Sequence, residues 1–196
     1  MNVIVISSPS ALSNEAKLIN ELFENGLDVF HLRKNSCTRA YCKQLISEID
    51  EAYHSRIALH QFHGLTADFG INRLHYKEQQ RKQLQETKTG LNFKTNVLST
   101  SIHQLMDIND LKGFDYAFFG PVFTSISKPG YAGVLDSHFR LPQRRNNTKL
   151  IALGGINASN FDEVNLMGFD GLALLGFIWN DPSKAVSNFK HIQERC

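Results

Sequence analysis

The stretch DYAFFGPVF, residues 115–123, decides the fold class of this chain. It is a short apolar run, rich in aromatic residues, that stops at Gly120 and Pro121. A run of this length bounded by turn residues is typical of a strand that is buried on both faces of a parallel sheet. The hydroxyl-rich segment TSISK, residues 124–128, follows at once. The stretch therefore predicts a buried strand that delivers polar groups to its carboxyl end.

Similar runs recur along the whole chain and alternate with segments of helical period at 13–26, 38–53 and 157–168, a pattern that indicates βα units. Asn157 is the expected N-cap of the last helix, and Gly26 and Gly168 are expected helix stops. We expect one α/β domain over residues 1–196, a minimal single-domain (β/α)8 TIM barrel, with a doubly wound open sheet as the alternative. The other predicted strands cover residues 2–8, 28–34, 56–62, 73–78, 95–101, 149–155 and 170–176.

Two units look abbreviated. Residues 65–70 carry only a weak helical pattern, and the segment KEQQRKQLQETKTG, residues 77–90, is too polar to pack broadly against a sheet. The third and fourth βα units are therefore expected to be short. Residues 124–147 show no clear helical pattern, and we interpret this segment as a cover over a site.

Composition narrows the functional classes. The chain has 196 residues, 42% of them hydrophobic, and a net charge of +2, with Lys and Arg spread along it. This predicts a globular protein without a nucleic-acid partner. The five-residue apolar run near the N-terminus is too short for a signal peptide or a membrane span. Cys37, Cys42 and Cys196 have no metal-ligand spacing, so a reduced, cytoplasmic protein is expected.

The carboxyl ends of the strands carry anion-binding groups. In the second strand, His31 and Arg33 share one face, and an inward arginine needs an anionic partner or ligand. Two glycine turns after the seventh and eighth strands expose backbone N–H groups of the kind that bind phosphate. The residues expected to bind substrate phosphate are Arg33, Ser101, Ser125, Ser127, Lys128, Gly154, Gly155, Leu175 and Gly176.

Four histidines, His31, His60, His75 and His103, are the candidate proton carriers at the strand ends. A metal site is the alternative, because His60 and His63 read H-x-x-H and three of the candidates end consecutive strands. A zinc hydrolase would usually add carboxylate ligands there, and none is found at these strand ends. We therefore expect acid–base chemistry and no metal.

The sequence resembles the thiamine phosphate synthase and TenI superfamily over nearly the whole chain. DYAFFGPVFTSISK is similar to the family's Asp-Tyr…Gly-Pro-x-Phe-x-Thr-x-Thr-Lys segment, and IALGGIN and GFDGLALLGFIW resemble its phosphate-binding regions. HLRKN and SIHQLMD resemble two further family elements. The resemblance implies a TIM-barrel enzyme of thiamin biosynthesis that binds a thiazole phosphate and forms small homo-oligomers. From the sequence itself, no membrane partner is expected.

The departures from the family pattern rank the activities. The synthase joins a pyrimidine pyrophosphate to the thiazole phosphate and uses Mg²⁺. Its pattern has a lysine and acidic residues where this chain has Asn35, His60 and Gln61, and Gln79 or Gln80. Hard divalent cations prefer carboxylates. The resemblance thus favours a TenI-like thiazole tautomerase without a cofactor, although some tautomerases have a histidine where this chain has Pro121. The alternatives are the Mg²⁺-dependent synthase and a non-catalytic, regulatory phosphate-ligand binder.

Overall fold

The computed structural model describes residues 1–87, 96–124, 135, 138–144 and 146–195. Eight parallel strands close into a barrel in the order β1 to β8, and β1 completes it by pairing with β8, where Val5 lies opposite Leu174. Closure excludes the doubly wound sheet, because an open sheet has two edge strands. The strands are β1 (Asn2–Ile6), β2 (Val29–Leu32), β3 (Ile57–Leu59), β4 (Arg73–Tyr76), β5 (Val97–Ile102), β6 (Tyr116–Phe119), β7 (Lys149–Leu153) and β8 (Gly171–Leu174).

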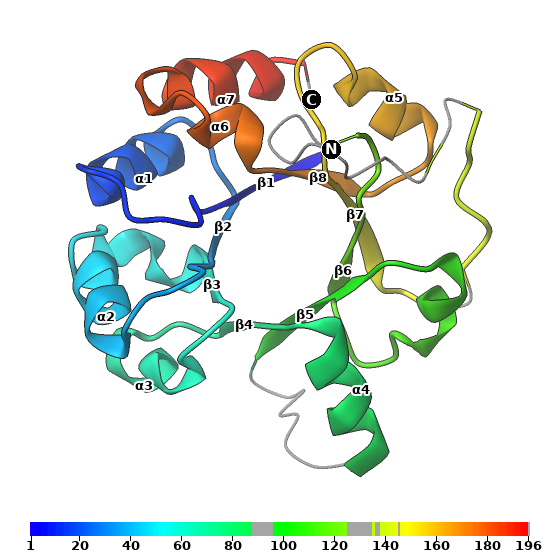
Figure 1. Ribbon diagram of the computed structural model, residues 1–196, viewed down its shortest axis with the longest axis horizontal. Helices are drawn as coiled ribbons and strands as arrows, with labels where there is room; N and C mark the ends of the chain where they lie inside the picture. The colour runs from blue at the N-terminus through cyan, green and yellow to red at the C-terminus, as the bar shows by residue number, and fades with distance from the viewer. Residues whose placement is uncertain (88–95, 125–134, 136–137, 145, 196) are drawn as a thin grey trace.

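Helices surround the barrel, and α7 at the C-terminus lies beside α1 (Figure 1). The α-helices are α1 (Glu15–Glu24), α2 (Arg39–Ser47), α3 (Thr66–Phe69), α4 (Glu78–Thr87), α5 (Phe161–Leu166), α6 (Gly176–Trp179) and α7 (Ala185–Gln193). Short 3₁₀ turns are η1 (Glu51–Arg56), η2 (His63–Leu65), η3 (Leu105–Asp110) and η4 (Pro182–Lys184). In the described part of the chain, no helix is long and apolar enough to span a bilayer.

Alternation along the strands separates two cores. Val3 and Val5 of β1 pack with the helices in the larger apolar cluster, whereas Ile4 and Ile6 face the barrel interior. The interior cluster also contains Tyr116, Phe118, Ile151 and Ala173. It is small for an eight-stranded barrel, whose interior is usually filled with branched apolar residues. Val29, Val97, Leu153 and Leu175 pack against this cluster, and buried polar side chains, among them His31, His75 and Ser99, share the interior with it.

The third unit is short, as expected, because only η2 and the four-residue α3 follow β3. The fourth is not: α4 is ten residues long, the same length as α1. Its polar residues are good helix formers, and pairs one turn apart support the helix, with Lys82 Nζ 2.6 Å from Glu78 Oε1 and Arg81 bonded to Gln85. Helix formation here does not depend on an apolar face.

Three further sequence expectations have different outcomes. Helix α5 begins at Phe161 with Asn160 at its N-cap, so Asn157 is not the cap. Asn157 instead accepts a hydrogen bond from the backbone of Ser159 at 2.8 Å, which makes a turn before the helix. Gly168 ends the helix in a left-handed conformation, with φ of 86°, as expected. Most of the expected cover, residues 125–134, 136–137 and 145, lies outside the described residues.

Candidate functional site

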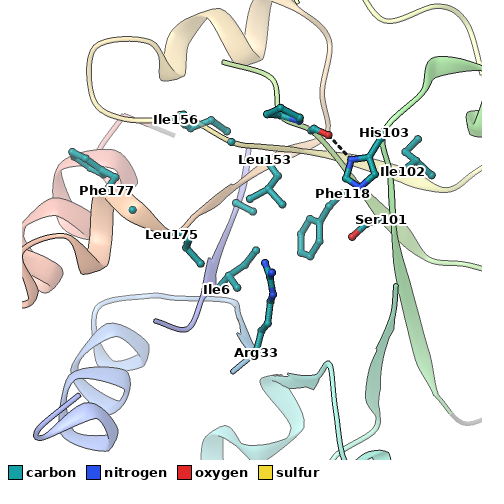
Figure 2. A pocket seen from close by; sticks show the side chains of 16 residues that line it. Ile6, Arg33, Ser101, Ile102, His103, Phe118, Leu153, Ile156, Leu175 and Phe177 are labelled. Carbon is teal, nitrogen blue, oxygen red and sulfur yellow. Dashed lines mark hydrogen bonds between the residues drawn. The ribbon is translucent and has the colours of Figure 1, made fainter. Parts of the chain in front are cut away.

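A cavity of about 320 Å³ opens at the carboxyl ends of the strands (Figure 2). We call it the mouth cavity. Ile6, Phe118, Leu153 and other apolar side chains form most of its wall. Its polar groups come from strand ends that are far apart in the sequence, which is the usual place of a ligand site in a barrel. Seven residues expected from the sequence to form the site line it, namely Arg33, Ser101, His103, Gly154, Gly155, Leu175 and Gly176.

The glycine turn after β7 is forced by close packing. Gly154 and Gly155 have φ values of 105° and 67°, which favour glycine. A Cβ atom on Gly154 would lie 2.8 Å from Pro121 Cα, and one on Gly155 would lie 2.6 Å from the carbonyl oxygen of Thr124. The side chain of Asn160 donates to the Gly155 carbonyl at 3.0 Å. The turn is therefore held rigidly against the segment that follows β6, with its backbone at the cavity surface.

Only one of the two glycine turns is followed directly by a helix. Helix α5 starts six positions beyond Gly155, whereas α6 begins at Gly176, directly after β8 and Leu175. The amide of Gly176 donates to no acceptor among the described residues. The backbone groups that face the cavity thus come from a turn at one strand and from the first turn of a short helix at the next.

Arg33 is the cation of the mouth cavity. Figure 2 shows its side chain rising between Ile6 and Phe118. The backbone of Arg33 is fixed by Ser7, whose Oγ donates to the Arg33 carbonyl at 2.6 Å and accepts from its amide at 2.9 Å. The guanidinium has no acidic partner within 4 Å among the described residues. It can therefore offer its donors to an anionic ligand.

His103 stands at the rim of the same cavity. Its Nδ1 lies 2.7 Å from the carbonyl oxygen of Gly120, the residue before Pro121 (Figure 2). A carbonyl only accepts, so Nδ1 carries a proton, and in the neutral ring the lone pair is then on Nε2. Glu78 Oε2 lies 3.9 Å from Nε2. Glu78 was not predicted as a site residue from the sequence. It lies two residues after β4, at the start of α4, and this position at a strand end is the signal that could have identified it.

A second cavity of about 670 Å³, here called the side cavity, adjoins the first. It shares with the mouth cavity a wall made of Ile6, Arg33, Ser101, His103, Phe118 and Leu153. Its other side carries His60 and His75, and beyond them the start of α4 with Lys77 and Glu78. The two cavities therefore lie next to each other and share one wall of side chains.

Three of the predicted histidines converge inside the barrel. His31 Nδ1 lies 2.9 Å from His60 Nε2, and the rings of His60 and His75 stack with centroids 3.9 Å apart. His75 donates from Nδ1 to Ser99 Oγ at 2.9 Å, because the Ser99 hydroxyl itself donates to the carbonyl of Leu74. Its Nε2 then accepts from Ser101 at 3.1 Å. His31 is wholly buried below the others and lines neither cavity.

These imidazoles are uncharged near neutral pH. Burial, and next the field of Arg33, lowers the pKa of His75 to about 3. Burial also lowers the pKa of His31 and of His60 well below the usual range, and neighbouring His75 lowers both further. Each neutral ring has one donor and one acceptor nitrogen. The barrel interior thus holds bases that do not add charge to it.

Some predicted groups are elsewhere. Ser125, Ser127 and Lys128 lie outside the described residues, so their place in the site stays a prediction. Lys34, which also ends β2, turns away from the cavities: its ammonium is 2% exposed and binds Glu15. His63, the second histidine of the H-x-x-H pattern, is bonded through Nε2 to the carbonyls of Leu59 and His75. It is not among the three clustered histidines.

Comparisons with known proteins agree with this architecture. A curated relative, a thiamine-phosphate synthase from Methanocella arvoryzae, is 40% identical over 83 residues, which is 41% of this chain. The match spans 39% of that relative's length. The crystal structure of thiamine phosphate pyrophosphorylase from Bacteroides thetaiotaomicron is similar with a TM-score of 0.75 and 27% identity, covering 99% of this chain and 96% of that one.

A further structure supports the fold alone, because its sequence has diverged more. Thiamine phosphate pyrophosphorylase from Pyrococcus furiosus gives a TM-score of 0.72 at 14% identity, covering 98% of this chain and 94% of that one. The family model described as thiamine monophosphate synthase, named TMP-TENI, matches residues 3–178, from within β1 to within α6. The chain therefore belongs to the thiamine monophosphate synthase family.

Proposed function

We propose that this protein binds a thiazole phosphate in the mouth cavity and moves a proton on its ring, as a TenI-like tautomerase of thiamin biosynthesis. The observation that carries the proposal is the set of polar groups at the two adjoining cavities: a rigid glycine turn and Arg33 on one side, and the imidazoles of His103 and His60 on the other. These groups suit an anion and a proton transfer, respectively.

The phosphate end of the ligand is assigned to the turns after β7 and β8. Backbone N–H groups that are not used within the fold are good donors to a dianion, and Gly176 has such an amide. A Cβ atom at Gly155 would clash with the Thr124 carbonyl, so glycine is needed for the turn to pack in this position at the cavity surface. Arg33 supplies the charge that two backbone turns lack.

The proton-transfer end is assigned to the imidazoles. His103 presents Nε2 as a lone-pair base, because Nδ1 is committed to the Gly120 carbonyl. Gly120 directly precedes Pro121, and both line the mouth cavity together with His103, so His103 lies in the region where some tautomerases carry their histidine. One imidazole removes a proton from the ring carbon or nitrogen and a second returns one at the other position, which isomerises the ring without any net consumption of protons.

The residues at the cavities do not fit the Mg²⁺ that the synthase reaction uses. Among the described lining residues of both cavities, the carboxylates are Glu78 and Glu86. Lys82 binds Glu78 at 2.6 Å. Gln61 binds the backbone of Lys34 through both ends of its amide. A hard cation would find Glu78, which is already paired, and the exposed Glu86, beside the cationic Lys77 and Arg33, so we route no step through a metal.

The synthase remains the second candidate for one specific reason. The side cavity adjoins the mouth cavity and carries Lys77 and Lys82 at its wall, so a second anionic substrate has room beside the first. The relatives reported above also carry the names of the synthase and the pyrophosphorylase. The third candidate, a non-catalytic binder, keeps the anion site and lacks turnover.

One experiment separates the three. The thiazole carboxylate phosphate is incubated with the protein in deuterated water, and isomerisation and deuterium uptake at the ring are followed by NMR. We expect both with the wild-type protein, and loss of both with His103→Asn at unchanged binding. His191→Asn, an exposed histidine of α7, is the matched control and should behave as wild type.

Two outcomes contradict the tautomerase. Binding by calorimetry without deuterium uptake leaves the non-catalytic binder. Formation of thiamin phosphate from thiazole phosphate, pyrimidine pyrophosphate and Mg²⁺ at about 1 s⁻¹ or faster, within the ordinary range of enzymes, makes the synthase the correct activity.

A further inference from the structure

A third cavity opens at the other end of the barrel, where the strands begin. This floor cavity has a volume of about 790 Å³ and is lined by Ile4, Val97, Ile151 and the ring of Tyr116, with Arg73 among its charged residues. The amino-terminal end of a barrel usually serves stability and not catalysis. Here, however, Tyr116 connects this cavity to the histidines below the mouth.

A continuous line of hydrogen bonds leads through the barrel interior. Tyr116 lines the floor cavity, and its hydroxyl lies 2.7 Å from His31 Nε2. The other nitrogen of His31 lies 2.9 Å from His60 Nε2. His60 lines the side cavity, and its Nδ1 has no hydrogen-bond partner among the described residues. Three side chains from β6, β2 and the end of β3 thus join two cavities that lie at opposite ends of the barrel.

These histidines differ from a histidine that serves packing. His54 is also buried, but its Nε2 is bonded to the carbonyls of Ile46 and Ile49, both at 3.1 Å, which ties a turn to a helix. Both nitrogens of His31 are instead bonded to side chains that can donate or accept, and no backbone group of the described residues is bonded to them. An apolar residue would fill this interior position without the cost of burying a polar ring.

The links can carry a proton in either direction, because every member both donates and accepts. If the Tyr116 hydroxyl donates to His31 Nε2, the proton of His31 is on Nδ1 and is donated to His60, whose own proton is then on Nδ1 at the side cavity. If every link reverses, His60 Nδ1 becomes an acceptor. We propose that Tyr116, His31 and His60 form a proton relay that connects the floor cavity to the reaction cavities.

One passage along the relay is balanced as follows. His60 gives its Nδ1 proton to a base or ligand in the side cavity, takes the His31 Nδ1 proton on Nε2, and His31 takes the Tyr116 proton on Nε2. A water at the floor returns a proton to the Tyr116 oxygen, and bulk solvent protonates the hydroxide that is left, so the net result is one proton moved from solvent at the floor to the side cavity. Burial raises the pKa of Tyr116 to about 12, although a hydrogen bond with Ser99 and the charge of Arg73 at the floor act in the opposite direction. The hydroxyl therefore regains a proton as it gives one up and does not persist as a phenolate. The use of this proton in catalysis rests on the proposed tautomerase; the relay itself does not.

The same three-histidine cluster has the spacing of a metal site, since one nitrogen each from His31, His60 and His75 lie within 4.8 Å of one another. Charge disfavours that use. Arg33 acts on His60 and His75, and Arg73 acts on His31, in each case against added positive charge. The cluster contains no carboxylate to offset a dication. Neutral rings that pass one proton at a time avoid that cost.

The relay is tested by NMR on protein labelled with ¹⁵N-histidine. In the wild-type protein, the relay requires head-to-tail tautomers, with the protons of His31 and His60 both on Nδ1 or both on Nε2. It also requires that the ring N–H of His31, which is fully buried, exchanges with deuterated water much faster than the core amides of β6 do. Tyr116→Phe should slow that exchange by about tenfold or more, and Tyr53→Phe, outside the barrel, should leave it unchanged.

Several results would overturn the relay. Three of these results come from the wild-type protein: a charged His31 or His60 at neutral pH, opposed tautomers of the two rings, or exchange of the His31 ring N–H that is as slow as that of the core amides. Each can be measured even if Tyr116→Phe does not fold. Unchanged exchange in folded Tyr116→Phe would also overturn the relay. One equivalent of a transition metal, lost in His75→Ala, would make the cluster a metal site. If these NMR results are as expected but the thiazole is never isomerised, the proposed function fails and the relay stands.

Discussion

The ammonium of Lys34 lies 2.5 and 2.6 Å from the two carboxylate oxygens of Glu15, and both side chains are 2% exposed. Lys34 also donates to the carbonyls of Ser8 and Ser10. The pair therefore ties the segment after β1 to the end of β2, where Arg33 enters the mouth cavity. A buried ion pair of this kind fixes geometry more than it adds net stability.

Removing one member of that pair should be costly. We expect Lys34→Met to lower the free energy of unfolding by about 3–5 kcal/mol, because the Glu15 carboxylate is left buried without its cation. Urea unfolding measures the loss. Lys43→Met, at an exposed pair with Asp68, should cost less than about 1 kcal/mol. If E15L/K34M proves less stable than Lys34→Met alone, the destabilisation does not come from the unpaired charge.

A methyl group at Gly155 should damage the site beyond its effect on the backbone. Gly155→Ala and Gly70→Ala place alanine at nearly equal φ values, 67° and 63°, so both carry a similar left-handed penalty of about 1–2 kcal/mol. At Gly70 nothing lies within 4 Å of the new Cβ, whereas at Gly155 it meets the Thr124 carbonyl. Calorimetry with thiazole phosphate should show about tenfold or greater loss of affinity for Gly155→Ala only. Equal affinities would remove the turn from the site.

Arg33 should account for much of the anion affinity. We expect Arg33→Ala to weaken thiazole phosphate binding by about 10- to 100-fold, as the loss of a charge-assisted hydrogen bond implies, without unfolding the domain. Arg39→Ala is the control, since that arginine is exposed and pairs with Asp68. The sequence predicts the same direction for Lys128→Ala. Wild-type affinity in both Arg33→Ala and Lys128→Ala would mean that the anion binds elsewhere.

The buried histidines should make the fold sensitive to mild acid. The pKa of His75 is lowered from 6.5 to about 3 in the folded protein, so below about pH 6.5 the unfolded chain binds a proton that the folded chain does not. Stability is fully present above that pH and is lost as pH falls toward about 3, by up to about 1.4 kcal/mol per pH unit for each such imidazole. Folded carboxyls with lowered pKa values, such as Asp170, act in the same direction only at lower pH.

Urea unfolding between about pH 7 and about pH 5 measures this slope in a window that excludes the carboxyls. His75→Gln should flatten it, whereas His191→Gln, an exposed histidine, should not. A flat profile for the wild-type protein would mean that the interior rings are protonated or hydrated in solution.

The fold was accessible from the sequence because apolar runs such as 115–123 recur at βα spacing, and such runs are decided locally. The period-2 rule likewise predicted that His31 and Arg33 share one face, and both lie on the interior side of the barrel in the structure. The sequence predictions that were wrong concern features that local hydrophobic patterns do not determine. Helix α4 is held by side-chain pairs that a hydrophobic pattern does not detect. Asn157 competes with Asn160 for the role of cap, and only the turn geometry decides between them.

The site was accessible only in part for a related reason. Residues at the carboxyl ends of parallel strands meet at the mouth of a barrel, so the strand ends can be used to predict the site. Seven of the residues predicted in this way line the mouth cavity. The partners that orient these residues come from distant segments. Tyr116 lies 85 positions from His31 in the sequence, and Glu78, which lies near His103, belongs to α4, the helix that precedes β5. Such pairings follow from barrel closure and register, which no local stretch of sequence contains.

The polar character of α4 has a consequence for how this protein can change. Among its described side chains, only Arg81 is buried, yet the start of the helix forms one wall of the side cavity. Most substitutions there would leave the packing of the barrel intact. Residues at that wall can therefore be exchanged, by mutation or by transfer of a segment from another chain, with little change in the folding free energy of the barrel. Such exchanges would alter which ligands the side cavity prefers.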